Sequence, residues 1–339
     1  MNYSMYIGGY GQESIARVAL RDGRLRLTST YPAVNASYLC LSPDERRLYA
    51  VGETKRFRGE AGGSVQSYDI AEDGALTETS IQPTHGEDPC HLSIVGNLLL
   101  TANYSSGSVS RFSLEPDGRI GAALPLIQHR GRGAKPDRQS GPHTHQVQRT
   151  PGGWLAVSDL GLDAVFFYPA AELSDEQPQP LRVSTPAGFG PRHCAFPRGR
   201  DTWYVLCELV SELLIYRGTP GSATLIGRVP VGDGAGENYP AALRLSPDER
   251  LLAATGRGQN VLSLFSIGEN GMLARLTEVS SGGDWPRDVQ FTPDGRFLVC
   301  CNERSNRVTA FALSEGRLEQ IDALELTAPT NVIFRRTEE

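Results

Sequence analysis

The sequence lacks several features that would each point to a particular class of protein. No apolar run reaches the length of a membrane-spanning helix, and the first residues, MNYSMYIGG, have neither the basic start nor the apolar stretch of a signal peptide. The chain has six cysteines in 339 residues, and no two of them form a C-x-x-C pair. These absences argue against a membrane protein, a zinc ribbon and a thiol redox enzyme, and they favour a cytoplasmic protein with reduced thiols.

Positive charge is also scarce. The formal net charge is -6 at pH 7, whereas nucleic-acid binding needs a basic surface, so we expect no nucleic-acid partner. The sequence has no G-x-S-x-G elbow of a serine hydrolase and no glycine-rich phosphate loop leading from a strand into a helix. No window of useful length repeats its apolar residues at the helical period. The chain is therefore expected to be built from strands.

What the sequence does have is a repeated segment, in which a Ser/Thr-Pro-Asp turn is followed by an apolar run. This pattern predicts a turn that leads into a strand. Three copies match closely, and they cover residues 41–53, 245–257 and 291–303. Weaker copies begin at Ile94, Thr150 and Pro197.

Each copy lies between two further expected strands. The strands that follow the copies begin about 44 to about 56 residues apart, which is the period of a propeller blade. They are expected at 14–20, 64–70, 108–114, 164–170, 212–218, 261–267 and 307–313. The strands that precede the turns begin at Pro89, Pro142, Pro191, Pro240, Pro286 and Pro329, and at Ala36 in the earliest copy. Seven copies predict an all-β fold, a seven-bladed β-propeller that forms a single domain over residues 1–339.

The two ends of the chain are expected to complete one blade together. The segment Tyr6-Ile-Gly-Gly-Tyr matches the second strand of the repeat, so the chain starts inside a blade. The segment beginning at Pro329 is a first strand that no second strand follows. Pairing of this C-terminal strand with the N-terminal blade would close the ring and remove the exposed edges of the sheets.

One segment interrupts the repeat. Residues 128–142 are long, polar and basic, and they end in Pro142-His143-Thr144-His145 at the start of a first strand. Long ordered insertions of this kind are usually functional, although a mobile surface loop is the alternative. Two histidines at this spacing also raise the possibility of a metal, but no matching acidic cluster accompanies them, so we expect none.

Ionisable residues recur at one end of the expected strands. Arg192 lies at the start of a first strand and Glu208 at the end of the second strand that runs back beside it, so both are expected at one rim. The start of the first strands carries His145, Arg192 and Arg287, and the next position carries His91, His193 and Asp288. The end of the second strands carries Glu53, Glu208, Arg257 and Glu303, with Asp159 close to the same position.

Such a rim predicts chemistry on a small anion. Ionisable groups gathered in a concave mouth are typical of a binding site, and guanidinium groups hold carboxylate or phosphate with two parallel bonds. A histidine beside a carboxylate can activate water near neutral pH. Each residue also has a structural alternative: an ion pair between strands for Arg192 and Glu208, links between blades for Arg287 and Asp288, and a structural role for His91 and His193.

These residues resemble the propeller-type lactonase family, which includes 6-phosphogluconolactonases and fungal carboxymuconate-cyclising enzymes. The resemblance rests on Lys135-Pro-Asp-Arg-Gln-Ser-Gly-Pro-His-Thr-His, Gly190-Pro-Arg-His, Cys207-Glu208 and Thr255-Gly-Arg-Gly, and it extends over essentially the whole chain. It implies a seven-bladed propeller that needs no cofactor. The chain departs from the family at two positions: Ala242 replaces an acidic residue, and Gly256 replaces the asparagine of Ser-Asn-Arg.

The resemblance also implies roles for particular residues. Catalysis would fall on His145 or His143, Arg192, Glu208 and Arg257. The other ionisable residues of the rim are expected to bind the substrate, namely His143, His193, Arg287, His91 and Glu303. The expected activity is hydrolysis of a sugar lactone, 6-phosphogluconolactone above all, by a cytoplasmic monomer or weak homo-oligomer whose partner is the anionic lactone. The alternatives are a lactone-forming cycloisomerase and a propeller that binds a sugar acid or a protein without turnover.

Overall fold

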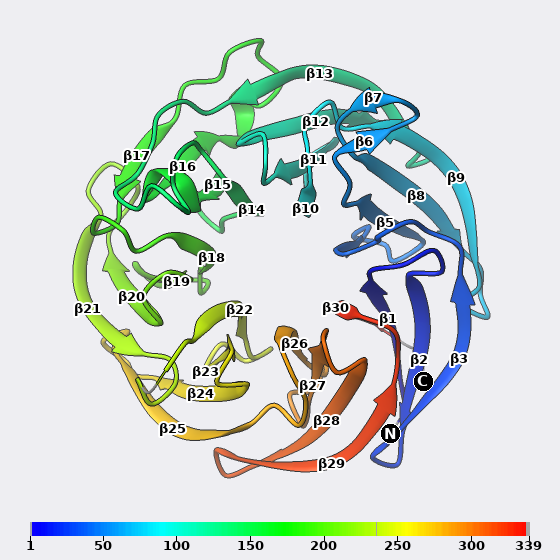
Figure 1. The fold of residues 1–339 in the computed structure, drawn as a ribbon, viewed down its shortest axis with the longest axis vertical. Helices are drawn as coiled ribbons and strands as arrows, with labels where there is room; N and C mark the ends of the chain where they lie inside the picture. The colour runs from blue at the N-terminus through cyan, green and yellow to red at the C-terminus, as the bar shows by residue number, and fades with distance from the viewer. Residues whose placement is uncertain (1, 235, 337–339) are drawn as a thin grey trace. The chain divides into compact units, whose positions relative to one another are not determined.

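The computed structural model describes residues 2–234 and 236–336, and this part of the chain consists almost entirely of strands (Figure 1). The strands form seven four-stranded sheets and one two-stranded hairpin. In every described pairing, neighbouring strands of a sheet run antiparallel, as expected for the blades of a propeller. The fold is a seven-bladed β-propeller, as the sequence predicted.

The described chain divides into two compact units. Unit 1 comprises residues 1–34, 195–218 and 224–339, and unit 2 comprises residues 35–194 and 219–223. The expectation of one domain over residues 1–339 stays a prediction. No described helix is long and apolar enough to cross a membrane.

Unit 1 holds three complete sheets. The first has the order β3 (Arg24–Tyr31), β2 (Ile15–Arg21), β1 (Asn2–Gly9), β30 (Pro329–Arg335). The second consists of β22 (Tyr239–Leu245), β23 (Leu251–Arg257), β24 (Val261–Ile267) and β25 (Leu273–Ser280). The third consists of β26 (Pro286–Phe291), β27 (Phe297–Asn302), β28 (Arg307–Ser314) and β29 (Arg317–Glu325).

Unit 2 also holds three complete sheets. They are β4 (Leu39–Leu41), β5 (Arg47–Gly52), β8 (Ser64–Ile70), β9 (Leu76–Pro83); β10 (Pro89–Val95), β11 (Leu98–Asn103), β12 (Ser108–Leu114), β13 (Ile120–Gln128); and β14 (Thr144–Arg149), β15 (Trp154–Asp159), β16 (Ala164–Pro169), β17 (Leu181–Ser184). Between β5 and β8 the hairpin β6 (Arg56–Phe57) and β7 (Glu60–Ala61) projects, and two short 3₁₀ helices, η1 (Leu160–Leu162) and η2 (Ala170–Glu172), flank β16.

The remaining sheet has the order β18 (Pro191–Ala195), β19 (Thr202–Cys207), β20 (Glu212–Arg217), β21 (Thr224–Pro230). Its strands have the same sequence pattern as the other six sheets. The strands expected after each repeat copy therefore all occur, and each lies within two residues of its predicted bounds.

The Ser/Thr-Pro-Asp turns show why these segments form hairpins. The hydroxyl of Ser246 donates to Asp248 at 2.6 Å, and the same oxygen accepts the amide of Leu251 at 2.9 Å. Asp248 in turn accepts the amide of Arg250, and the intervening Glu249 adopts a left-handed φ of 57°. The side chains thus satisfy backbone groups that a tight turn leaves unpaired, and the left-handed residue returns the chain to the ladder.

The two ends of the chain complete one sheet. Strand β30, red in Figure 1, lies beside the blue strand β1, with Tyr6 opposite Ile333 and Ile7 opposite Val332. Met5, Ile7 and Val332 are buried and pack with Val299 and Val308 of the neighbouring sheet in unit 1. The predicted pairing of the C-terminal strand with the N-terminal blade is confirmed.

Two predicted strand starts were wrong. Strand β14 begins at Thr144 rather than Pro142, because the amide of His143 donates to the side chain of Asp159 instead of joining the ladder. Strand β4 begins at Leu39 rather than Ala36, because the amide of Ser37 donates to the carbonyl of Asn35 in a tight turn. In both cases a local hydrogen bond replaces the first rung of the sheet.

Candidate active site

A β-bulge occurs at the same place in several first strands. The pairing of β10 with β11 passes from Pro89 to His91, that of β14 with β15 from Thr144 to Gln146, and that of β26 with β27 from Pro286 to Asp288. The strand register passes over Cys90, His145 and Arg287. Bulges re-aim side chains and are frequent beside active sites. His145 and Arg287, which the sequence aligned with each other, both occupy this position.

Four predicted residues of unit 1 form two ion pairs, and we call Glu208, Arg257, Arg287 and Glu303 the arginine cluster. Arg257 Nη2 lies 2.6 Å from Glu208 Oε2, and its Nε donates to the carbonyl of Tyr239 at 2.9 Å. Both members of this pair are buried, with 6% and 5% of their surface exposed. The second pair joins Arg287 Nη1 to Glu303 Oε2 at 3.2 Å and is more accessible to solvent.

The two ion pairs influence each other electrostatically. Burial lowers the pKa of Arg257, the carboxylate of Glu208 opposes this effect, and the positive charge of Arg287 adds to it. The guanidinium nevertheless remains charged, since arginine does not lose its proton in proteins. The carboxylate of Glu303 also opposes the effect of burial, so two guanidinium groups and two carboxylates form a charge-balanced cluster with fixed N–H donors.

Five predicted residues of unit 2 also lie together, and we call His91, His143, His145, Arg192 and His193 the histidine cluster. The ring centroids of His91 and His193 are 5.7 Å apart, and those of His145 and His193 are 5.8 Å apart. His91, His145, Arg192 and His193 are each less than 10% exposed. The cluster is therefore a group of imidazoles with one guanidinium, buried except for the partly exposed His143.

Aromatic rings hold the histidines in place. Tyr38 packs against His91 with ring centroids 4.0 Å apart, and Tyr104 stacks on His143 at 4.6 Å. Tyr104 also meets His145 edge to face at 5.5 Å. On the far side, Cys90 Sγ lies 3.9 Å from His145 Nδ1. The rings of His143 and His145 thus share one tyrosine.

Hydrogen bonds define which nitrogen carries the proton in two of these rings. His143 Nδ1 lies 2.9 Å from the carbonyl of Tyr104, which can only accept, so Nδ1 carries the proton and Nε2 of the neutral ring is a base. Arg192 Nη1 lies 3.2 Å from His193 Nε2, and a guanidinium can only donate. His193 therefore accepts this bond as a neutral ring and fixes the direction of Arg192.

The inserted segment 128–142 is anchored by buried side chains on either side of η1. His129 Nδ1 lies 2.6 Å from Asp159, whose other oxygen accepts the amide of His143 at 2.8 Å. Gln139 is completely buried, and its amide donates to Asp163 at 2.7 Å. These contacts argue against the alternative of a mobile surface loop.

Asp163 connects this segment to Arg192. One of its oxygens accepts Gln139 Nε2 and the amide of Gly190 at 2.9 Å, and the other accepts the amide of Gly188 at 2.7 Å. Gly190 immediately precedes the strand that carries Arg192. The turn before Arg192 and the inserted segment therefore share one carboxylate.

Asp288 is placed differently from its sequence neighbours. It is buried, lies 2.9 Å from Arg244 Nη2, and accepts the side-chain amide of Asn331 and the backbone amide of Val332. These contacts tie β26 to β22 and β30, so the structural alternative that the sequence left open describes Asp288. Arg287 instead faces Glu303 and the ring of Tyr10, 5.3 Å from its centroid.

The two departures from the family pattern have different surroundings. A Cβ atom on Gly256 would come within 2.3 Å of Asn238 Oδ1, so Asn238 occupies the space that a side chain at residue 256 would need. Ala242 is completely buried and packs with Leu262, Leu264 and Val289. An acidic side chain at residue 242 would therefore be desolvated among apolar groups in this structure.

Several residues that contact the two clusters were missed in the sequence. Tyr38 and Tyr104 lie in segments with no distinctive motif, whereas Tyr10 ends the segment Tyr6-Ile-Gly-Gly-Tyr, which was used only to place a strand. Trp285 and Arg304 were missed as well, although Trp285 precedes Pro286 at a strand start and so had a recognisable position. Among the described residues, no three His, Cys, Asp or Glu side chains are grouped so that they could hold a metal ion.

Comparison with known proteins identifies the family. Residues 4–334 match the family model described as lactonase, 7-bladed β-propeller. A protein of Bacillus subtilis named 6-phosphogluconolactonase is 30% identical over 327 residues, which cover 91% of this chain and 90% of that protein. A 6-phosphogluconolactonase of Formosa agariphila is 27% identical and covers 89% of this chain and 88% of its own length.

A solved structure agrees with this assignment. The periplasmic gluconolactonase of Pseudomonas aeruginosa is 28% identical, with a TM-score of 0.90 over 98% of this chain and 99% of that one. Together with the seven sheets and the pairing of β30 with β1, the match over nearly the full length establishes one conclusion. The chain belongs to the lactonase family of seven-bladed β-propellers.

Proposed function

We propose that the protein is a lactonase that hydrolyses 6-phosphogluconolactone to 6-phosphogluconate, a reaction of the pentose phosphate pathway. Membership of the lactonase family and the names of the Bacillus and Formosa relatives support this proposal. The observation that carries it is the buried Arg257–Glu208 pair with Arg287 beside it, because this arrangement holds guanidinium donors in fixed positions where water is largely excluded.

In the arginine cluster, Arg257 would stabilise the negative charge that develops on the carbonyl oxygen when water attacks the lactone. A fixed donor at such an oxygen contributes about 2.7–4 kcal/mol to the stability of the transition state. The carboxylate of Glu208 is engaged by Arg257 at 2.6 Å. We therefore assign Glu208 to orienting Arg257.

In the histidine cluster, a neutral imidazole would take the proton from the attacking water. His143 and His145 both lie against Tyr104, and the hydrogen bond from His143 Nδ1 leaves its Nε2 as a base. His145 remains the residue that the family resemblance favours, so we propose His145 as the base and His143 as its neighbour in the substrate site. Arg192, which His193 directs, would provide a second guanidinium donor for the charge that develops on the carbonyl oxygen.

A second candidate substrate is unphosphorylated gluconolactone, because the relative from Pseudomonas is named a periplasmic gluconolactonase. The same name gives a periplasmic location for that relative, so the cytoplasmic location of this chain stays a prediction. The absence of a cofactor and the state of monomer or weak homo-oligomer also stay predictions.

Hydrolysis of both lactones at controlled pH tests the proposal. We expect the wild-type protein to accelerate opening of 6-phosphogluconolactone above the spontaneous rate, and Arg192→Ala and Glu208→Gln to abolish most of this acceleration. Arg24→Ala is the control, because Arg24 forms an exposed ion pair with Asp322 far in sequence from either cluster. No acceleration of either lactone by the wild-type protein would refute the proposal.

A further inference from the structure

A left-handed residue lies directly before the first strand in four of the seven described sheets, and in a fifth it lies four residues before β4. These residues are Asn35, Asp88, Gly190, Trp285 and Ala328, with φ values of 51°, 51°, 64°, 65° and 37°. Glycine, asparagine and aspartate adopt this conformation readily, whereas a bulky side chain does so only under strain. Trp285 is therefore the one bulky side chain among these five positions. A strained residue of this kind is a reason to look for function.

Hydrogen bonds to both the amide and the carbonyl of Trp285 hold it in this strained conformation. Its amide donates to Asn260 Oδ1 at 2.8 Å, and its carbonyl accepts the amide of Glu303 at 3.1 Å. The neighbouring Asp284 is fixed as well, because Asn260 Nδ2 donates to its carboxylate at 2.8 Å. The indole is therefore aimed by the framework of unit 1 and is only half-buried.

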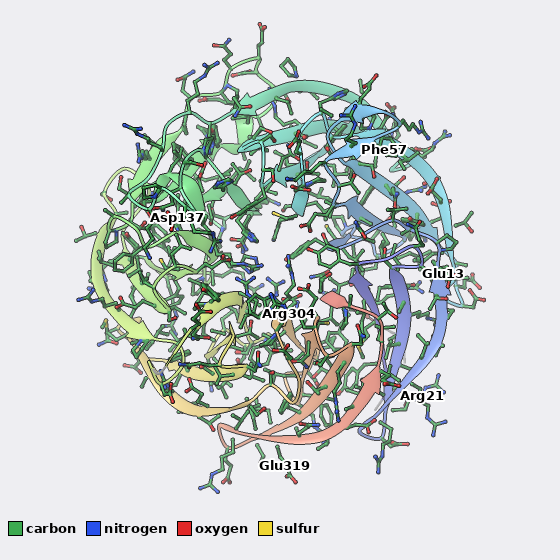
Figure 2. The ribbon with its side chains drawn as sticks, viewed as in Figure 1. Glu13, Arg21, Phe57, Asp137, Arg304 and Glu319 are labelled. Carbon is green, nitrogen blue, oxygen red and sulfur yellow. The ribbon has the colours of Figure 1, made fainter. Side chains whose placement is uncertain are left out.

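The indole ring holds two guanidinium groups. The guanidinium carbon of Arg304 lies 3.3 Å from the centroid of the ring, and that of Arg257 lies 5.3 Å from it. Figure 2 shows Arg304 on the turn between β27 and β28, near the start of β26. Stacking on an aromatic face orders an arginine without occupying its N–H donors. Trp285 thus places Arg304 beside the arginine cluster.

Arg304 differs from the neighbouring arginines because no carboxylate forms an ion pair with it among the described residues. Arg257 is paired with Glu208 and Arg287 with Glu303. Within residues 2–234 and 236–336, the guanidinium of Arg304 forms no ion pair and no hydrogen bond, and the side chain is exposed. An ordered guanidinium with its donors unused is suited to bind an oxyanion in two parallel bonds.

We propose that Arg304, held in place by Trp285, binds the phosphate group of a phosphorylated lactone and so determines the preference for that substrate. The proposal rests on the proposed function, since it takes the arginine cluster to be part of the substrate site. In this proposal Arg304 binds the phosphate, which is remote from the reacting carbonyl, and Arg257 donates to the carbonyl oxygen.

The first experiment compares Arg304→Ala with the wild-type protein on two lactones. For 6-phosphogluconolactone we expect KM to rise about tenfold or more with kcat little changed, because one charge-assisted pair with phosphate is lost. For gluconolactone, which has no phosphate, we expect neither constant to change. Arg307→Ala is the matched control, since Arg307 is an exposed arginine three residues further along the same segment. Equal behaviour of the two variants would overturn the proposal.

The second experiment separates positioning by Trp285 from ordinary packing. Asparagine occupies the left-handed position before β4, so Trp285→Asn removes the ring and keeps a residue suited to the backbone. We expect an unchanged or higher melting temperature together with the same rise in KM for the phosphorylated lactone. Ala328→Asn controls for the backbone change at an equivalent position. A lower melting temperature with an unchanged KM would show that Trp285 only packs.

Binding measurements distinguish failure of this proposal from failure of the proposed function. Calorimetry with 6-phosphogluconate needs no turnover, and we expect Arg304→Ala to weaken binding about tenfold or more relative to Arg307→Ala. If the wild-type protein binds 6-phosphogluconate in this way but opens neither lactone, the proposed function fails and the role of Arg304 stands. If the protein hydrolyses the phosphorylated lactone and Arg304→Ala matches the wild-type protein in both assays, the role of Arg304 fails.

Discussion

The arginine cluster of unit 1 and the histidine cluster of unit 2 differ in the charges of their side chains and in how these are paired. Arg257 and Arg287 each lie opposite a carboxylate, so the charges of the arginine cluster are fixed and matched. His91, His145 and His193 pack mainly against other rings, and His193 accepts a bond from Arg192 as a neutral group. The first arrangement suits stabilisation of charge and the second suits transfer of a proton.

The largest effect we predict lies within the arginine cluster itself. Arg257→Ala removes the proposed oxyanion donor, so kcat/KM should fall about 100- to 1000-fold. It also leaves Glu208 buried without this partner, which should destabilise the fold by about 3–5 kcal/mol. Arg287→Ala breaks a more accessible pair and should cost about 1 kcal/mol or less in stability. Steady-state kinetics and denaturant unfolding of both variants check the contrast.

The ranking of the two arginines is what matters in that experiment. If Arg287→Ala destabilises the protein as much as Arg257→Ala, burial is not what distinguishes the two pairs. Arg257→Lys keeps the charge but cannot reproduce both the contact with Glu208 and the bond from Nε to Tyr239. We expect this variant to recover stability more fully than activity.

A double-mutant cycle tests whether the two clusters act in one reaction. If Arg192 and Arg257 stabilise the same transition state, the loss of kcat/KM in Arg192→Ala/Arg257→Ala should be clearly smaller than the product of the two single losses. If the clusters serve separate functions, only one of the single variants should lose lactonase activity. Arg192→Ala combined with Arg24→Ala provides the additive reference.

A smaller effect is expected from Asp163, whose side chain accepts hydrogen bonds from Gln139, Gly188 and Gly190. Asp163→Asn replaces one acceptor oxygen with an NH2 donor. This donor would face either the amide of Gly188 or the amides of Gln139 and Gly190, which are donors themselves. We expect a loss of kcat/KM of about tenfold through misplacement of Arg192, at a cost of about 1–3 kcal/mol for the unsatisfied buried groups.

The decisive measurement for Asp163 is the effect of Asp163→Asn on kcat/KM in a protein that already carries Arg192→Ala. The kinetic effect of Asp163→Asn should disappear when Arg192 is already alanine, because Asp163 would act through Arg192. A purely structural loss would persist in that background. Asp44→Asn, which alters a turn elsewhere in unit 2, is the control for a local loss of stability.

The fold was predictable from the sequence because its signals are local. The turns at Asp44, Asp248 and Asp294 close through hydrogen bonds within five residues, and so their motif is visible in the sequence itself. Ionisable residues of the clusters were predictable for the same reason, since position relative to these turns decides which end of a strand they occupy. The starts of β14 and β4 were missed because Asp159 and Asn35 redirect the backbone there.

The partners of the predicted residues were less predictable. Nothing in the sequence around Tyr104 indicates that its ring contacts both His143 and His145, because the three residues meet only when β11 and β14 have packed. The contact of Arg304 with Trp285 depends on a left-handed backbone at residue 285, which an aromatic residue rarely adopts. A prediction from sequence assigns an aromatic residue its common backbone conformation, so it does not reveal the left-handed backbone at Trp285.

The smallest predicted effect concerns an ionisable pair outside both clusters, which shows what a purely structural link contributes. Tyr3 donates to Asp294 at 2.6 Å. Burial and this bond raise the pKa of Tyr3 to about 12, while bonds from Tyr3 and Thr292 lower the pKa of Asp294 despite its partial burial. The stabilisation should therefore be lost below about pH 4, as Asp294 gains a proton, and again as the pH rises through about 12. Tyr3→Phe should cost about 1 kcal/mol or less at pH 7 and leave kcat/KM unchanged, since the pair is partly exposed. A change in kcat/KM would mean that activity depends on structural contacts outside the two clusters and not only on the charged residues within them.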